Sequence, residues 1–275
     1  MSYRMIALDL DGTLLDGANR IREETLGALK QCLARGLQVV LVTGRHHVAA
    51  YPYYHQLGLD SPVLCCNGTY AYDYQAHNAL FSNPLTKQQA RQVLEKIRQY
   101  GVHSLMYVDN AMTYETREPH LDTLLAWADP LPDHVRPAIT RVDRFEAEIE
   151  RVAIVWKFAI SHPDTDELQA FIADVEDHIG LSCERSGHHR YDVAQTGNSK
   201  GGLLAAWLKT QDIDPAEVIA FGDNHNDISM LEMAGMGVAM GNSDDTVKAS
   251  ARLIIGNNNS NAIADTLRRY VVMAN

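Results

Sequence analysis

The chain has 275 residues, of which 46% are hydrophobic and 21% charged, and its formal net charge is -11. This length allows one large or two medium domains, and the composition is that of a soluble globular protein. The acidic balance argues against nucleic acid as a partner, so an anionic substrate must be held by local cations or a metal ion. No apolar run approaches the ~18 residues of a membrane span, so we expect no membrane partner.

The N-terminus and the cysteines predict a cytoplasmic location. Asp9 and Asp11 interrupt the apolar segment that a secretory signal needs. The cysteines have no metal-site spacing and are typical of reduced, mostly buried thiols; they are Cys32, Cys65, Cys66 and Cys183. The sequence indicates no obligate protein partner.

The first predicted element is a strand over residues 5–8, an apolar run that suits a buried parallel sheet. Asp9 and Asp11 follow it, and Gly12 allows a sharp turn. Two carboxylates this close need a cation or a shared proton, which indicates a metal site, acid–base chemistry or both. An exposed Asp-rich turn is the alternative. An EF-hand calcium loop is excluded, because the sixth position from Asp9 is Leu14 rather than glycine.

Strands and helices then alternate up to residue 84. The patterns predict a helix over residues 21–35, a strand starting at residue 38, a helix over 48–57 and a strand over 62–66. Strand–helix–strand order implies parallel pairing through right-handed crossovers.

The middle of the chain mixes helices with hairpins, which predicts an inserted α+β module. Helices are expected over residues 86–100, opened by a Thr86–Gln89 capping box, over 121–128 and over 164–179. Strands are expected over 103–108, 112–116, 152–160, 181–184 and 190–194.

The parallel pattern resumes near Lys200. Helices are expected over residues 201–208, 227–234, 244–251 and 261–270, and strands over 218–221, 237–240 and 253–255. The predicted fold class is therefore α/β, a Rossmann-like parallel sheet with helices on both faces, plus an inserted α+β cap domain. We expect residues 1–84 and 188–275 to form a discontinuous core, and residues 85–187 to form the cap.

Three more loops are expected beside Asp9 and Asp11, because the carboxyl ends of parallel strands meet at one edge of a sheet. Thr43 and Gly44 can donate hydrogen bonds to a phosphate oxygen, although a simple glycine turn explains them equally well. Lys200 stands at a helix start, where the helix dipole favours an anion. Its flanking residues are not those of a P-loop, and a solvated surface lysine is the alternative.

The third loop carries Asp223 and Asp227, four residues apart after a strand. This spacing suits one direct metal ligand and one supporting carboxylate. Carboxylate oxygens without a histidine or cysteine cluster favour Mg²⁺ over zinc.

The ordered set Asp-x-Asp-Gly-Thr, Thr-Gly, Lys and Gly-Asp-x-x-x-Asp closely resembles the haloacid dehalogenase superfamily of phosphotransferases, over the whole chain. The insert, preceded by Asn67-Gly68, resembles the Cof-type branch with a large α/β cap and its relatives described as pyridoxal phosphate phosphatases. The resemblance implies that Asp9 is the nucleophile, and that Asp11 is the general acid and then the base.

The resemblance also implies a ligand set. Mg²⁺ would be held by Asp9, the main-chain carbonyl of Asp11 and Asp223, with Asp227 orienting them. The phosphoryl group would be bound by Thr43, Gly44 and Lys200, helped by the Leu10 amide and Asn226. Phosphoryl transfer needs in-line positioning and neutralised oxygens, which such a site supplies.

The expected function is therefore a Mg²⁺-dependent phosphatase for small phosphorylated metabolites, with pyridoxal 5'-phosphate and sugar phosphates as leading substrates by resemblance alone. A phosphomutase and a phosphoaspartate signalling module are the alternatives, although the insert argues against a one-domain receiver. Candidate groups for the substrate's polar head are Arg45, His46, His47, His188, His189 and Arg190, each equally well explained as a basic surface turn.

Overall fold

The computed structural model describes residues 3–187 and 189–272, and the chain divides into two compact units. Unit 1 comprises Met1–Arg45, Pro52–Phe81 and Ser199–Asn275, and unit 2 comprises His46–Tyr51 and Ser82–Asn198. Among the described residues, no helix is both long and apolar enough to cross a membrane.

The return from the insert to unit 1 lies at Ser199, later than the expected residue 188. The reason is strand pairing, because β11 (Arg190–Ala194) pairs with β9 (Val155–Ser161) in the sheet of unit 2. Residue 188 itself lies outside the described residues.

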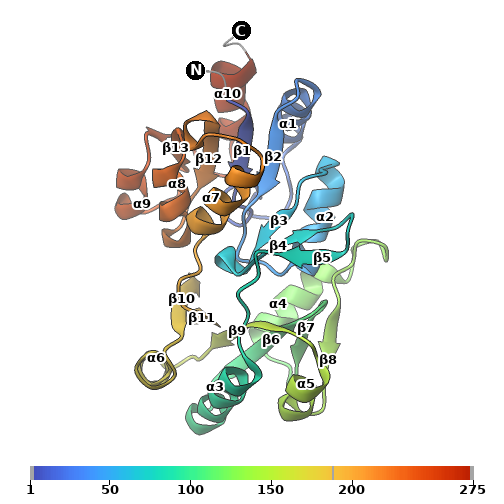
Figure 1. The fold of residues 1–275 in the computed structure, drawn as a ribbon, viewed down its shortest axis with the longest axis vertical. Helices are drawn as coiled ribbons and strands as arrows, with labels where there is room; N and C mark the ends of the chain where they lie inside the picture. Colours follow the sequence, from blue (N-terminus) through green and yellow to red (C-terminus); the bar gives the residue numbers. More distant parts are fainter. Residues whose placement is uncertain (1–2, 188, 273–275) are drawn as a thin grey trace. The chain divides into compact units, whose positions relative to one another are not determined.

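Unit 1 is built on a five-stranded parallel sheet of order β14-β13-β12-β1-β2. Strand β1 lies between β12 and β2, two strands from distant parts of the chain, as Figure 1 shows, with Ala7 opposite Val40 and Ala220. The strands are β1 (Met5–Leu8), β2 (Gln38–Leu41), β12 (Val218–Gly222), β13 (Met236–Ala239) and β14 (Leu253–Ile254).

Helices cover both faces of this sheet, which confirms the predicted fold class. Met5 and Ala7 of β1 pack with Leu204 of α7 and Met230 of α8 in one buried cluster. The helices of unit 1 are α1 (Glu23–Ala34), α7 (Lys200–Thr210), α8 (Ile228–Met233), α9 (Asp245–Ser250) and α10 (Ala262–Leu267), with the 3₁₀ segments η2 (Pro215–Glu217) and η3 (His225–Asp227) and the π-helical segment η4 (Arg268–Val272). The helix α2 (His47–Leu57) has residues in both units, because His46–Tyr51 belong to unit 2.

A small antiparallel sheet also belongs to unit 1, and the sequence predicted only its first strand. It has the order β3-β4-β5. Its members are β3 (Val63–Cys65), β4 (Tyr70–Asp73) and β5 (Asn78–Leu80), with the turn η1 (Cys66–Gly68) after β3.

Unit 2 contains a six-stranded sheet of order β10-β11-β9-β6-β7-β8, antiparallel except for the parallel pair β7 and β8. Its other strands are β6 (His103–Val108), β7 (Ala111–Tyr114), β8 (Ile139–Arg141) and β10 (Ser182–Gly187), and its helices are α3 (Lys87–Tyr100), α4 (Pro119–Ala128), α5 (Phe145–Arg151) and α6 (Thr165–Ile179). β8 and α5 directly follow a proline-containing stretch, in a part of the chain where only one short helix, over residues 121–128, was expected.

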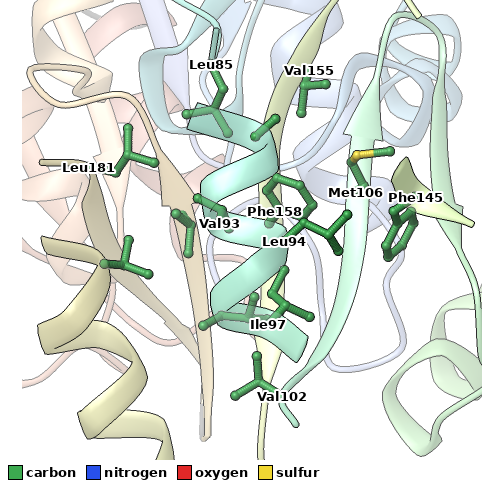
Figure 2. Packing of buried hydrophobic residues seen from close by; sticks show 14 of the residues in the cluster. Leu85, Val93, Leu94, Ile97, Val102, Met106, Phe145, Val155, Phe158 and Leu181 are labelled. Carbon is green, nitrogen blue, oxygen red and sulfur yellow. The ribbon is translucent and has the colours of Figure 1, made fainter. Parts of the chain in front are cut away.

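Helix α3 organises the hydrophobic core of unit 2. Figure 2 shows Val93, Leu94 and Ile97 of α3 beside Met106 of β6 and Phe158 of β9. The predicted capping box starts this helix, because Thr86 accepts from the Gln89 amide and the Gln89 side chain accepts from the Thr86 amide.

Candidate active site

The polar loops of unit 1 meet at the carboxyl ends of its parallel strands, as the sequence predicted. Asp9 directly follows β1, Thr43 follows β2, and Asp223 follows β12. Lys200 opens α7, whose N-cap is Ser199, with its hydroxyl accepting from the Gly202 amide. The fold thus brings four separate segments of the chain to one edge of the sheet.

The buried ammonium group of Lys200 joins two carboxylates. Its Nζ lies 2.6 Å from Asp9 Oδ1 and 2.7 Å from Asp227 Oδ1. The three side chains are almost inaccessible to solvent. Asp9 Oδ2 has no hydrogen-bond partner among the described residues.

Burial and crowding change the acidity of this cluster. Burial raises the pKa of Asp9 well above its ordinary value, the Lys200 ammonium opposes this, and Asp227 and Asp223 raise it further. For Lys200, burial lowers the pKa, but Asp227 and Asp9 outweigh burial and the net shift is upward. Lys200 is therefore charged, and one ammonium faces more than one carboxylate.

Asp227 serves as a fixed support within its loop. Its Oδ2 accepts hydrogen bonds from the amides of Asp223 (2.9 Å) and Asn224 (3.0 Å), while its Oδ1 faces Lys200. Both oxygens are thus engaged, which suits an orienting carboxylate better than a direct metal ligand.

Asp223 is held by two residues for which the sequence indicated no role. The Thr13 hydroxyl donates to its Oδ1 at 2.8 Å, and the side-chain Nδ2 of Asn242 donates to its Oδ2 at 3.2 Å. Burial raises the pKa of Asp223 to about 6, with a further rise from Asp227 and opposition from Thr13 and Lys200. Gly12, at φ +81°, lies against this carboxylate, because a Cβ there would come within 2.3 Å of Asp223 Oδ2.

The Asp11 side chain pairs with Arg45. Arg45 donates from Nε to Asp11 Oδ2 at 2.7 Å and from Nη2 to Oδ1 at 2.6 Å. The Asp11 side chain is 54% exposed, whereas that of Arg45 is 15% exposed and lies 5.1 Å from the centre of the Tyr53 ring. Asp11 is thus more exposed than Asp9 and Asp227, but its charge still contributes to the raised pKa of Asp9 and of Asp223.

The expected phosphate-binding groups lie around the same edge of the sheet. The Thr43 hydroxyl accepts from the Arg45 amide at 3.1 Å but donates to no acceptor among the described residues. In the described chain, the Leu10 amide likewise has no acceptor. The Asn226 side chain donates to Asn67 Oδ1 at 3.0 Å, and its own oxygen is buried without a partner in the structure described.

Asn67 also contacts the Thr43–Gly44 turn. Its amide donates to the Thr43 carbonyl, and a Cβ on Gly44 would lie 2.8 Å from Asn67 Oδ1. Asn67 has a φ of 55°, a left-handed conformation that asparagine tolerates better than most residues. The sequence signal for this turn is the dipeptide Asn67-Gly68.

The carboxylates of Asp9, Asp223 and Asp227 could hold a metal ion, because each offers an oxygen within 4.8 Å of the others. The donors are hard oxygens, and burial together with their mutual repulsion raises the pKa of Asp9 and Asp223. A small divalent cation such as Mg²⁺ fits both features. The Asp11 side chain is not part of this group.

The sequence analysis did not identify Asn242 as a contact of Asp223, although its position in the chain could have indicated this role. Asn242 lies shortly after β13, the same position relative to a strand that identified the other loops. Thr13 belongs to the Asp-x-Asp-Gly-Thr segment, but its hydrogen bond to Asp223 depends on tertiary structure.

Comparison with known proteins gives a family match over most of the chain. The family described as haloacid dehalogenase-like hydrolase matches residues 6–267. Pyridoxal phosphate phosphatase YbhA of Escherichia coli (strain K12) is 46% identical over 272 residues, covering 99% of this chain and 100% of that protein.

Two further relatives extend over nearly the whole chain. 5-Amino-6-(5-phospho-D-ribitylamino)uracil phosphatase YitU of Bacillus subtilis (strain 168) is 28% identical, covering 97% of both chains. The crystal structure of a haloacid dehalogenase-like hydrolase from Bacteroides thetaiotaomicron superimposes with a TM-score of 0.86 at 26% identity, covering 98% of this chain and 99% of that one.

Proposed function

This chain belongs to the haloacid dehalogenase-like hydrolase family, and we propose that it is a Mg²⁺-dependent phosphatase that cleaves small phosphomonoesters through an aspartyl-phosphate. The main support is the position of Asp9, a buried carboxylate with one oxygen on Lys200 and the other without a partner among the described residues.

In the first step, Asp9 Oδ2 forms a bond to phosphorus while the bond between phosphorus and the ester oxygen breaks. Asp11 gives a proton to the leaving alkoxide. In the second step, water attacks the phosphorus of the aspartyl-phosphate and gives a proton to Asp11. Inorganic phosphate leaves, and the Asp9 carboxylate is restored.

The acid–base role requires Asp11 to separate from Arg45. Both Asp11 oxygens accept hydrogen bonds from this guanidinium, and this pairing stabilises the ionised carboxylate, whereas a general acid must carry a proton. A substrate phosphate, as a competing anion, offers Arg45 an alternative partner.

The charge of the phosphoryl group requires cations and hydrogen-bond donors. We propose that Asp9, Asp223 and the Asp11 main-chain carbonyl hold Mg²⁺, while Asp227 orients the loop of Asp223. When bound, Mg²⁺ neutralises negative charge on the phosphoryl oxygens. The proposed donors to these oxygens are the Thr43 hydroxyl, the Leu10 and Gly44 amides, Lys200 and Asn226.

We propose pyridoxal 5'-phosphate as the leading substrate, with sugar phosphates as the next class. The support is the 46% identity to the pyridoxal phosphate phosphatase of E. coli over 99% of this chain. We also propose a cytoplasmic location, which the four free cysteine thiols support.

The substitution Asp9→Asn tests the proposed mechanism. We expect turnover of p-nitrophenyl phosphate in Mg²⁺ to fall by at least about a thousandfold, because an amide is not a nucleophile at phosphorus. Circular dichroism is expected to be unchanged. Asp60→Asn, at an exposed aspartate of the same unit, is the control and should keep full activity.

A phosphate-release assay over phosphorylated metabolites tests the substrate separately. We expect pyridoxal 5'-phosphate to give the highest kcat/KM. A sugar phosphate in first place would overturn the substrate proposal but leave the mechanism intact, whereas turnover by Asp9→Asn would remove Asp9 from its role.

A further inference from the structure

Unit 2 contains a cavity of about 440 Å³ that the proposed mechanism does not use. This volume falls within the range of metabolite-binding pockets, roughly 300–1,000 Å³. Residues from β6, α4, β9 and the hairpin of β10 and β11 line it, so it is complete within one unit. Its ionisable lining residues are His103, Glu118, His120, His162, His189 and Arg190.

Arg190 brings a half-buried positive charge into this cavity. Its Nη1 lies 3.0 Å from Nδ1 and 3.2 Å from Nε2 of His120. It forms no ion pair with a carboxylate among the described residues, although the chain as a whole is strongly acidic. A guanidinium can only donate hydrogen bonds, so His120 must accept with an unprotonated nitrogen. Burial and the Arg190 charge lower the pKa of His120 to about 4, which agrees with this arrangement.

The acidic group of the cavity is already engaged by other residues. Glu118 lies 3.4 Å from His103 Nδ1 and accepts from the Ser161 hydroxyl at 3.5 Å. Glu118 precedes α4, yet its side chain does not cap that helix. The positive N-terminal end of the ten-residue α4 is therefore not neutralised by a capping carboxylate. It lies beside Arg190, which contacts His120 in the first turn of this helix.

The β10–β11 hairpin holds the guanidinium in place. Gly187 allows Arg190 to lie against the backbone, because a Cβ on Gly187 would come within 2.5 Å of Nη2 and 2.7 Å of Nε. His189, on the same hairpin, lies 3.3 Å from the Thr165 hydroxyl through its Nδ1. Arg190 is thus positioned by structure rather than by a carboxylate partner.

We propose that this cavity binds the oxyanion group of a small metabolite, either a phosphate or a carboxylate, with Arg190 as its principal charged contact. Arginine suits both groups, because its fork of N–H donors matches two oxygens of either. A transition metal fits less well, because Arg190 repels a cation and no three ligand atoms of this cavity form one of the metal-binding groups among the described residues.

The test uses the full-length, Mg²⁺-loaded protein with isotope-labelled histidine. The ring resonances of His120 and His189, assigned with single His→Gln variants, are followed by NMR during separate titrations with malonate and inorganic phosphate. We expect a saturable shift with at least one ion, and the stronger of the two identifies the group that the cavity prefers. The resonances of unit 2 separate this site from product binding at Asp9.

Two variants test the role of Arg190. Arg190→Gln is expected to weaken binding about tenfold or more, because a charge-assisted hydrogen bond is lost. Gly187→Ala should also weaken it by displacing the guanidinium without removing the charge. Arg91→Gln, which removes an equal charge from an exposed site on α3, is the control and should bind as the unaltered protein does.

Each result of these titrations either supports or overturns the proposed oxyanion site. No saturable shift with either ion would overturn the proposal, as would equal affinity in Arg190→Gln or a shift produced by Zn²⁺ alone. Turnover of p-nitrophenyl phosphate by Arg190→Gln, measured in parallel, shows that the variant is folded. Loss of this binding with turnover intact would leave the phosphatase proposal untouched.

Discussion

Lys200 is the residue on which the electrostatics of the site depend. Its side chain is 1% exposed and contacts Asp9 and Asp227 together. Removing one partner of a buried ion pair leaves an uncompensated charge and costs about 3–5 kcal/mol. The two carboxylates are not equivalent, however, because Asp227 has backbone donors and Asp9 has none in the described residues.

This asymmetry predicts opposite stability effects for two substitutions. Lys200→Met should lower the free energy of unfolding by about 3–5 kcal/mol in Mg²⁺-free buffer, because two buried carboxylates lose their cation. Asp9→Asn should be at least as stable as the unaltered protein, because burial and neighbouring carboxylates raise the pKa of Asp9 and disfavour its charged form.

Urea denaturation of the two variants measures these effects. Added Mg²⁺ should raise the denaturation midpoint of the unaltered protein more than that of Asp9→Asn, since the amide is a weaker ligand. A strongly destabilised Asp9→Asn would contradict the view that the site holds excess negative charge.

For single residues, the sequence predicted which of them lie at the same edge of the sheet, but not which side chains contact one another. The strand-end rule placed Asp9, Thr43 and Asp223 together, and these positions depend only on the order of elements. The pairing of Asp11 with Arg45 could not be predicted without the tertiary structure, because the long arginine side chain after a turn can point in many directions. The spacing of Asp223 and Asp227 predicted one metal ligand and one supporting carboxylate, but only the family resemblance said which residue has which role.

At the scale of elements, the turn after β1 connects the backbone to the metal-binding group. Gly12 has a φ of +81°, and its missing side chain leaves room for the Asp223 carboxylate. The Gly12 carbonyl also accepts from Asn242 at 2.9 Å. Gly36, in the turn between α1 and β2, has nearly the same φ of +84°, but a Cβ added there would meet nothing within 4 Å.

Alanine at these two glycines separates backbone strain from site geometry. Both Gly12→Ala and Gly36→Ala should cost about 1–2 kcal/mol of stability, because a Cβ disfavours the left-handed conformation. Only Gly12→Ala should also raise the Mg²⁺ concentration needed for half-maximal activity, by about tenfold or more, because it displaces Asp223. Equal Mg²⁺ dependence in the two variants would show that Gly12 has only a conformational role.

Helices and strands were predicted correctly where the hydrophobic pattern was long and where a capping motif marked its start. The helix α3 has a capping box and a clear apolar face, and its extent matches the expectation. The strands β4, β5 and β8 have only three or four residues each, too few for a period-two pattern to stand out. The helix α5 has seven residues and follows a stretch with several prolines, which hid it.

At the scale of the whole molecule, buried ionisable groups make stability depend on pH. Burial lowers the pKa of His47 to about 4, and burial with Arg190 does the same for His120. Asp223 acts in the opposite direction, because its pKa is raised to about 6. The folded state therefore resists protonation at the histidines and favours it at the aspartate.

Whether stability rises or falls with pH depends on how many protons the folded and the unfolded chain bind. Between the unfolded histidine pKa of about 6.5 and the folded value of about 4, the unfolded chain binds protons that the folded chain does not. Stability from each histidine is therefore complete above about pH 6.5 and is lost as pH falls to about 4, by up to about 3 kcal/mol. Asp223 instead adds stability as pH falls from about 6 to its ordinary pKa of 3.8.

The double substitution His47→Gln and His120→Gln isolates the contribution of these two histidines, because Asp223 and the buried His46 are the same in both proteins. We expect the unfolding free energy of the double variant to fall less than that of the unaltered protein between pH 6.5 and pH 4, as measured by urea denaturation. His178→Gln, with a side chain that is 72% exposed in the original protein, should retain the original pH dependence. If the double variant loses stability as steeply as the unaltered protein, the acid sensitivity comes from other groups, and His47 and His120 do not govern it.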